Sequence, residues 1–153
     1  MKRVFAVCGG SLLTVLLLAV AVCAQEVKTD YFTLDLPADW KIPGKVESLP
    51  NGNTAAIVQN TKDWTTLSIV IMPSPTMSIK DIATQTVNDM KDGGFTVSEM
   101  QQIGKSYVVE FTTSDAKGIH YFTSNGKQSS AVTIIGETTD AGKELLQKRF
   151  KPV

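Results

Sequence analysis

The stretch SYVVEFTTSDAKGIHYFTSNGKQSSAVTIIGE, residues 106–137, decides the fold of this chain. Three runs rich in β-branched and aromatic residues, 106–113, 119–124 and 128–137, are separated by two turn signals. The second signal is Asn125-Gly126, a pair that tolerates the positive φ angles of a two-residue hairpin turn. The stretch therefore predicts three consecutive antiparallel strands.

The pairing of these strands follows from the second turn. If Ser124 pairs with Lys127, His120 lies opposite Ala131, because opposed residues keep a constant index sum. A sheet that is apolar on both faces needs a cover on both, so the remaining chain should supply helices or strands to each face. Alternation places Val109, Phe111 and Phe122 on one face, and Val108, Ile119, Tyr121, Val132 and Ile134 on the other.

Residues 1–24 have the pattern of a signal peptide. Lys2 and Arg3 precede a long apolar run, and Val22-Cys23-Ala24 offers side chains that a signal peptidase accepts. We expect cleavage after Ala24 and a periplasmic or secreted mature domain. Two alternatives would place the chain at a membrane: an uncleaved anchor over residues 4–24, or lipidation of Cys23, which a bulky Val in the preceding lipobox positions disfavours.

Cleavage would also change the chemistry available to the chain. Both cysteines, Cys8 and Cys23, would be removed, which leaves no thiol for metal binding or nucleophilic catalysis. Loss of Lys2 and Arg3 leaves 13 basic against 15 acidic residues, a net charge of −2. This balance argues against nucleic acid and against an anionic membrane surface as electrostatic partners.

The mature chain reads as a short mobile leader, residues 25–30, and one domain, residues 31–153. Expected strands cover 31–36, 45–49, 54–60, 64–72 and 95–103, with Trp40 as a plug for one end of the core. Ser78 should cap a helix that ends at Gly93-Gly94, and residues 138–150 should form a second helix with Phe150 in its buried stripe. The predicted fold is α+β, a central antiparallel sheet of about seven to eight strands flanked by two helices.

The segment YFTLDLPADW, residues 31–40, carries a family resemblance together with LLQKRFKPV at the C-terminus. An exported chain that opens on such a strand, followed by a helix, a meander and a closing helix, resembles the PsbP-like and DcrB-type α/β domains. The supporting residues pack the core, so the resemblance implies an α/β/α sandwich and a non-catalytic accessory or binding role. The supporting positions are Phe32, Leu34, Pro37, Trp40, Leu145, Leu146 and Phe150.

No catalytic, cofactor or metal motif emerges from the sequence. His120 is the only histidine, which excludes a paired-histidine metal site, and strand alternation puts its nearest carboxylate, Glu110, on the opposite face. Ser124, Ser129 and Ser130 lack the context of an activated nucleophile. We therefore expect no enzyme activity, no cofactor and no metal.

Two loops are the candidate binding surface. Trp64 at a strand start, and Pro73, Pro75 and Met77 in the following crossover, could form an apolar lip for a peptide or small ligand. Ordinary core packing is the alternative for Trp64. The favoured function is an interaction module that contacts an envelope protein; a small-ligand-binding protein and a hydrolase with an unrecognised site are the alternatives.

Overall fold

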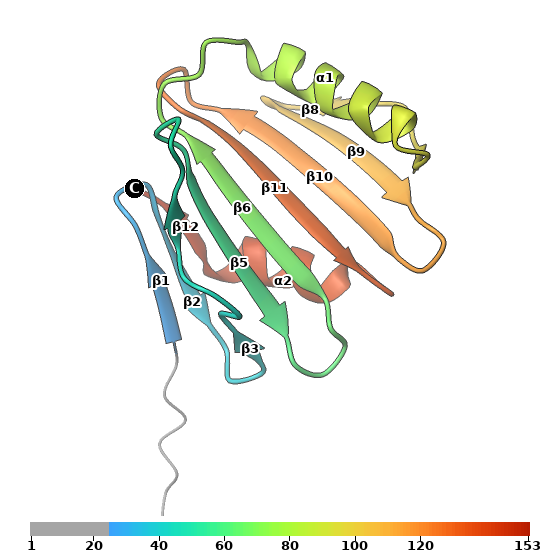
Figure 1. The fold of residues 1–153 in the computed structure, drawn as a ribbon. Coiled ribbons are helices and arrows are strands. Elements are labelled where there is room, and N and C mark those ends of the chain that lie inside the picture. The colour runs from blue at the N-terminus through green and yellow to red at the C-terminus, as the bar shows by residue number, and fades with distance from the viewer. Residues whose placement is uncertain (1–24) are drawn as a thin grey trace, which may run out of the picture.

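A computed structural model describes residues 25–153 as two antiparallel sheets and two helices (Figure 1). The large sheet has nine strands in the order β3-β5-β6-β11-β10-β9-β7, with β4 beside β5 and β8 beside β9; the small sheet has the order β1-β2-β12. No helix within residues 25–153 is long and apolar enough to cross a membrane. The elements are β1 (Gln25–Lys28), β2 (Phe32–Leu36), β3 (Trp40–Lys41), β4 (Glu47–Ser48), β5 (Thr54–Asn60), β6 (Thr66–Met72), α1 (Ile79–Asp92), β7 (Thr96–Val97), β8 (Gln101–Ile103), β9 (Ser106–Thr112), β10 (Lys117–Ser124), β11 (Ser129–Gly136), α2 (Asp140–Arg149) and β12 (Phe150–Pro152).

The fold is α+β with a large antiparallel sheet, as predicted, and the three-stranded meander β9–β10–β11 is confirmed. The predicted count of seven to eight strands was too low, because four of the nine strands have only two or three residues. Strands that short show no alternation in a sequence. The small sheet was not predicted.

The predicted register of the last hairpin is wrong by two positions. Ser124 pairs with Ser129, so His120 lies opposite Thr133. The side chain of Asn125 causes the shift: its Oδ1 accepts hydrogen bonds from the backbone N–H groups of Lys127 and Gln128, at 2.9 Å each. The loop therefore holds four residues, 125–128, and its centre lies one residue later than in the predicted two-residue turn at Asn125-Gly126. A shift of two keeps every side chain on its predicted face.

The first and the last segment of residues 25–153 lie on either side of β2 in the small sheet, which corrects two predictions. Residues 25–28 were expected in a mobile leader, but they form β1, and Val27 pairs with Leu34 and is buried. Phe150 was expected at the end of the last helix, but it begins β12, pairs with Leu34 and packs its ring against Phe32 at 5.3 Å. The sequence QEVK has one apolar residue, which is too weak a pattern to predict a strand. Burial of Val27 against the core stabilises this strand in the folded chain.

The predicted strand 95–103 is broken in the middle. Residues 98–100 separate β7 from β8, and both short strands pair with β9. Ser98 makes the bend: its backbone N–H donates to the Glu110 carbonyl, and its Oγ accepts from the Glu110 N–H. Phe95 was expected inward but is 37% exposed, with its ring edge against Phe111.

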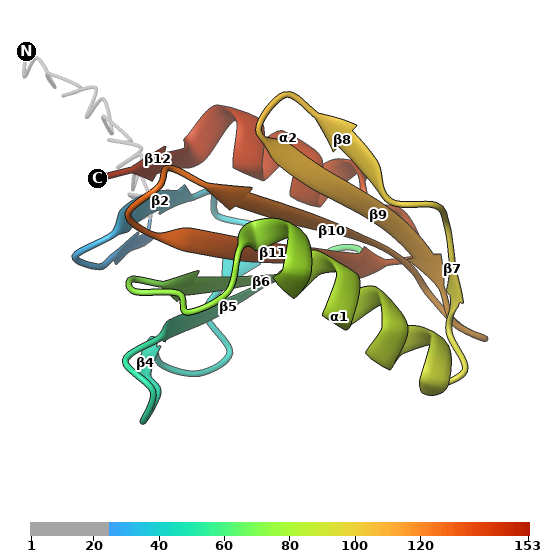
Figure 2. The same ribbon diagram turned by 90° about the horizontal axis from the view of Figure 1, so that it is seen from above.

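The two helices cover opposite faces of the large sheet, and opposite halves of it (Figure 2). Helix α1 starts at the predicted cap Ser78 and places Ala83 and Val87 on β9 and β10. Helix α2 lies on the other face, where Gly142 allows close approach to Ile134 of β11: a Cβ at Gly142 would lie 2.4 Å from that side chain. The predicted plug Trp40 is buried in the same core. The α2 face of β9 and β10 is therefore left without a helix over it.

Candidate functional site

Two adjoining hollows of about 360 and 380 Å³ lie on the open half of the α2 face. They share Ser98, Glu110 and Ile119, so together they form one channel along β9 and β10, which we call the α2-side groove. It follows β9 from Val108 to Thr112, about 16 Å at the rise of a strand. The groove is lined by Thr96, Val97, Ser98, Gln101, Ile103, Val108, Glu110, Phe111, Thr112, Lys117, Gly118, Ile119, Tyr121, Thr139 and Lys143.

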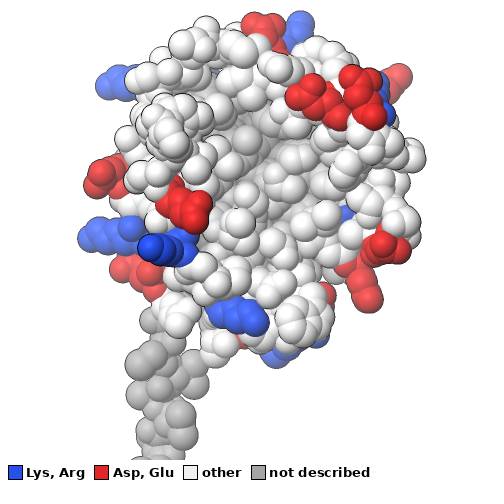
Figure 3. Space-filling view, viewed as in Figure 1, with Lys and Arg blue, Asp and Glu red and all other residues white. Residues whose placement is uncertain are grey.

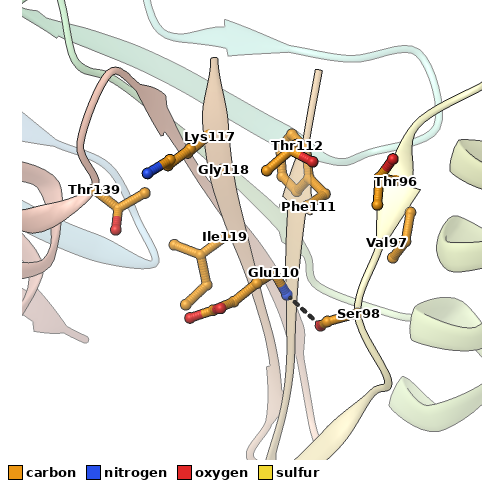
Figure 4. Close-up of a pocket in the computed structure, with 10 residues that line it drawn as sticks. All are labelled: Thr96, Val97, Ser98, Glu110, Phe111, Thr112, Lys117, Gly118, Ile119 and Thr139. Carbon is orange, nitrogen blue, oxygen red and sulfur yellow. Dashed lines mark hydrogen bonds between the residues drawn. The ribbon is translucent and has the colours of Figure 1, made fainter. Parts of the chain in front are cut away.

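The groove has an apolar floor and a polar rim. Ile119 and Val108 are almost fully buried at its base. Figure 4 shows the rim at one end: Lys117 and Thr139 lie on one side of the strands and Thr96 and Ser98 on the other. The bond between the Glu110 N–H and Ser98 Oγ, 3.0 Å, holds the outer wall in place. An apolar base bordered by hydroxyl groups and charges is the composition of a binding surface.

Charges of both signs line the groove. Lys117 and Lys143 come from β10 and α2, and Glu110 lies on β9 between the two hollows. Burial, and then the negative charge of Glu110, raise the pKa of Tyr121 above its ordinary 10.0. The tyrosine hydroxyl therefore keeps its proton at neutral pH and can donate a hydrogen bond into the groove.

His120 lies on the other face of the same strand, under α1. Its ring stacks between Phe111, at 4.9 Å, and Phe122, at 5.5 Å, and its Nδ1 is 2.8 Å from Thr133 Oγ1. Burial lowers the pKa of His120 from 6.5 to about 4, so the ring is neutral at pH 7. Glu110 is on the opposite face, as the alternation predicted, and pairs with Ile119. Within residues 25–153 no three His, Asp or Glu side chains gather as metal ligands.

The structure separates the residues of the predicted apolar lip. Trp64 is 64% exposed in the loop before β6, and Met77 is 41% exposed in the crossover after it, with Pro73 and Pro75 half-buried beside it. Strand β6, seven residues long, lies between them, a span of about 23 Å. Trp64 and the crossover residues therefore cannot form one surface.

Trp64 has a strained backbone, with a φ of 60° that bulky residues rarely adopt. The loop is held from several sides: Asp63 Oδ1 accepts from the Thr65 N–H at 2.9 Å, and Thr61 bonds to the Asp39 carbonyl. The Lys41 ammonium lies 5.3 Å from the Trp64 ring. Exposure of Trp64 excludes the core-packing interpretation for this residue.

A second open region lies on the α1 face, over β5, β6 and β11. Figure 3 shows this face hollowed, with Lys, Arg, Asp and Glu confined to its border. Ile57 is its most exposed large apolar side chain, at 46%. Most of the other side chains that alternation points to this side are half-buried and uncharged, as with Val70 and Thr133.

Sequence reasoning did not find the α2-side groove. Alternation along 106–137 placed Val108, Ile119 and Tyr121 on one apolar face, and this was correct. It could not show that α2 would lie over β11 and leave β9 and β10 uncovered, because the position of a helix over a sheet depends on tertiary contacts such as that of Gly142 with Ile134. The available signal for a polar rim was the presence of hydroxyl residues at 96, 98 and 112.

The fold has a counterpart among solved structures. The solution structure of cyanobacterial PsbP (CyanoP) from Synechocystis sp. PCC 6803 matches with a TM-score of 0.55, over 97% of this chain and 98% of that chain, at 13% identity. The chain has the PsbP-like fold. The PsbP-like part of the predicted resemblance is thereby confirmed, and its DcrB-type part stays a prediction.

Other comparisons of this PsbP-like domain give less. A crystal structure from Bacteroides thetaiotaomicron VPI-5482 matches with a TM-score of 0.43 and 13% identity, over 80% of this chain and 45% of that chain. No protein-family model matches the sequence. No curated protein matches it either. At these identities the likeness is one of fold alone.

Proposed function

We propose that this chain is an exported, non-catalytic interaction module that binds an extended segment of an envelope protein in the α2-side groove. The observation that carries the proposal is the open half of the α2 face, where an apolar floor and a polar rim run along β9. A length of about 16 Å accommodates roughly five residues of extended chain. Export rests on the signal-peptide pattern of residues 1–24, which lie outside the described residues.

The lining of the groove suits a protein segment better than nucleic acid. Its side chains offer donors and acceptors above buried Ile119 and Val108, the arrangement of a protein interface core and rim. Glu110 between Lys117 and Lys143 gives mixed charge, whereas a phosphate backbone needs a continuous positive surface. Contact with a membrane would follow only from an uncleaved anchor or a lipidated Cys23.

Binding of a small ligand is the second candidate. Each hollow of the groove, at about 360 and 380 Å³, falls in the volume range of small-molecule sites. In this alternative one compact molecule occupies one hollow, and the exported chain is a ligand-binding protein. The third interpretation, a hydrolase, gains no support from His120, which is neutral and stacked beneath α1.

The test is a crosslinking pull-down from envelope extract with residues 25–153 as bait. Thr112 is exposed at the groove, so Thr112→Arg should block the channel without unfolding the domain and should remove the partner. Gln85→Arg adds the same charge on the exposed side of α1 and is the matched control. Mass spectrometry would identify the crosslinked residues.

Two outcomes would contradict the proposal. Retention of every partner by Thr112→Arg would remove the groove from consideration. Loss of partners only in Trp64→Ser or Met77→Ser would move the binding surface to one of the loops. Crosslinks to Lys117 and Lys143 in the unmodified domain would support the groove directly.

A further inference from the structure

A third cavity, of about 300 Å³, is lined by residues of α2 and by Trp40 of β3 and Asn60 of β5, at the edge of the large sheet. Its apolar surfaces come from Pro37, Trp40 and Leu145, the last two almost fully buried. It shares no lining residue with the α2-side groove. Asp39, Asn60, Ala141, Glu144, Lys148 and Arg149 complete the lining.

Two largely buried residues, Asn60 and Trp40, bring hydrogen-bond donors to the lining of this cavity. Asn60 is 4% exposed, and its Oδ1 accepts from the Lys62 N–H at 2.8 Å, which leaves the Nδ2 amide as the free end. Trp40 is 5% exposed and has a donor-only indole N–H. No hydrogen bond among residues 25–153 involves the Asn60 Nδ2 or the Trp40 Nε1, and neither atom is fully buried, so both keep some access to solvent. An acceptor that enters the cavity can therefore reach these donors without breaking a bond inside the protein.

The charges at the rim favour an anionic acceptor. The carboxylate of Asp39 is paired with Lys62 at 3.2 Å, and that of Glu144 with Lys148 at 2.7 Å. Arg149 lines the cavity, is exposed, and takes part in none of the ion pairs among the described residues. Its planar guanidinium can donate two parallel hydrogen bonds to a carboxylate.

The position relative to α2 allows an anion here. The lining residues 141, 144, 145 and 148 follow the flank of the helix at helical spacing. The partial negative charge of a helix C-terminus acts mainly beyond its last turn, so it opposes an anion on the flank only weakly. The apolar floor, in contrast, favours a ligand that also has a hydrophobic part.

We propose that this cavity binds an organic carboxylate with one apolar side chain, about the size of leucine. The carboxylate accepts hydrogen bonds from Arg149, Asn60 Nδ2 and the Trp40 indole N–H, while the apolar part lies on Trp40 and Leu145. Such a group exists as a free small acid and as the C-terminal residue of a peptide. The site is independent of the groove and of the protein bound there.

The experiment is a ¹H–¹⁵N NMR titration of residues 25–153 with three probes. 4-Methylpentanoate represents a free acid, N-acetyl-leucine a chain end, and N-acetyl-leucinamide the same body without the charge. We expect at least one of the two acids to shift the Trp40 indole and Asn60 amide signals saturably, with a Kd of about 1 mM or tighter. The indole signal of Trp64, which lines no part of this cavity, is the internal control.

Variants test the role of each donor. Arg149→Gln should raise the Kd of the acid about tenfold, because it removes a charge-assisted contact from an exposed position. Lys151→Gln loses the same charge on β12, outside the cavity, and should leave the Kd unchanged. Trp40→Phe keeps the ring and removes the N–H, so the Asn60 signal should report weaker binding if the fold is retained.

The outcomes distinguish a free small acid from the C-terminal residue of a peptide, and both from the absence of a carboxylate site. Equal binding of both acids supports a free small acid, and binding of N-acetyl-leucine alone supports a chain end. Absence of a saturable shift with either acid overturns the proposal, as does an equal shift with N-acetyl-leucinamide. None of these results depends on a partner in the α2-side groove, since that site has separate lining residues.

Discussion

The two faces of the β9–β10 pair differ more than their shared strands suggest. On the α1 face, Val109 and Phe122 pack with Ala83 and Val87 of α1, and the ring of His120 stacks between Phe111 and Phe122. On the α2 face, two residues that alternate with these, Glu110 and Tyr121, line an open groove. A one-residue step along β10 therefore separates an ionisable ring that burial keeps neutral from side chains that can meet a partner. The chemistry of a residue type indicates function here only after its face is known.

The largest expected difference concerns core packing. Phe122→Ala should lower the free energy of unfolding by about 3–5 kcal/mol, because the ring is 1% exposed beneath α1. The neighbouring Thr123→Ala, exposed on the other face, should change it by less than about 0.5 kcal/mol. Urea midpoints with unchanged m-values would measure both. Similar costs for the two variants would mean that α1 does not seal its face.

Acid should lower the stability of the folded chain through His120, which lies on the α1 face. Burial lowers its pKa from 6.5 to about 4 in the folded chain, so as the pH falls the unfolded chain takes up this proton first. The contribution of His120 to the free energy of unfolding is fully present above pH 6.5. It is lost as the pH falls towards 4, and this loss amounts to at most about 3 kcal/mol.

Denaturation at a series of pH values would measure this effect. The chain with His120→Gln keeps every carboxylate, so the difference between the two stability curves isolates the histidine. The difference should grow between pH 6.5 and 4 and be flat at higher pH. Parallel curves would show that His120 is accessible to solvent in the folded chain.

Gly118 marks a smaller effect on the same face. The Phe111 ring lies over this glycine, and a Cβ there would come within 2.0 Å of the ring. Gly118→Ala should cost about 1–3 kcal/mol, and less when Phe111→Leu removes the clash. Gly44, where an added Cβ would meet no atom within 4 Å, is the matched control. Additive effects of Gly118→Ala and Phe111→Leu in a double-mutant cycle would contradict the contact.

The smallest expected effect belongs to the open face. Glu110→Gln should change stability by less than about 0.5 kcal/mol, because this carboxylate is exposed and takes part in none of the ion pairs among the described residues. It should lower the pKa of Tyr121 towards 10.0, since the Glu110 charge contributes to raising it. NMR titration of labelled tyrosine rings measures the shift. An unchanged Tyr121 pKa would place the two groups further apart than the groove geometry requires.

Local sequence by itself determined the long elements of this protein. Alternation predicted β6, β9, β10 and β11 and the face of each side chain, because the strand period is two and cannot drift within one strand. Strand β10 begins at Lys117, two residues before the predicted start at Ile119. Ser78 and Gly93-Gly94 predicted both ends of α1, since capping acts within one turn of the helix.

Only the tertiary structure decided the short strands, the hairpin register and the candidate sites. Val27 and Phe150 become strand residues because Leu34 and Phe32 lie beside them, far away in the sequence. The groove exists because Gly142 seats α2 on Ile134 and so leaves β9 and β10 open. Exposure of Trp64 and burial of His120 follow in the same way, because what covers a residue depends on contacts between elements that no local pattern encodes.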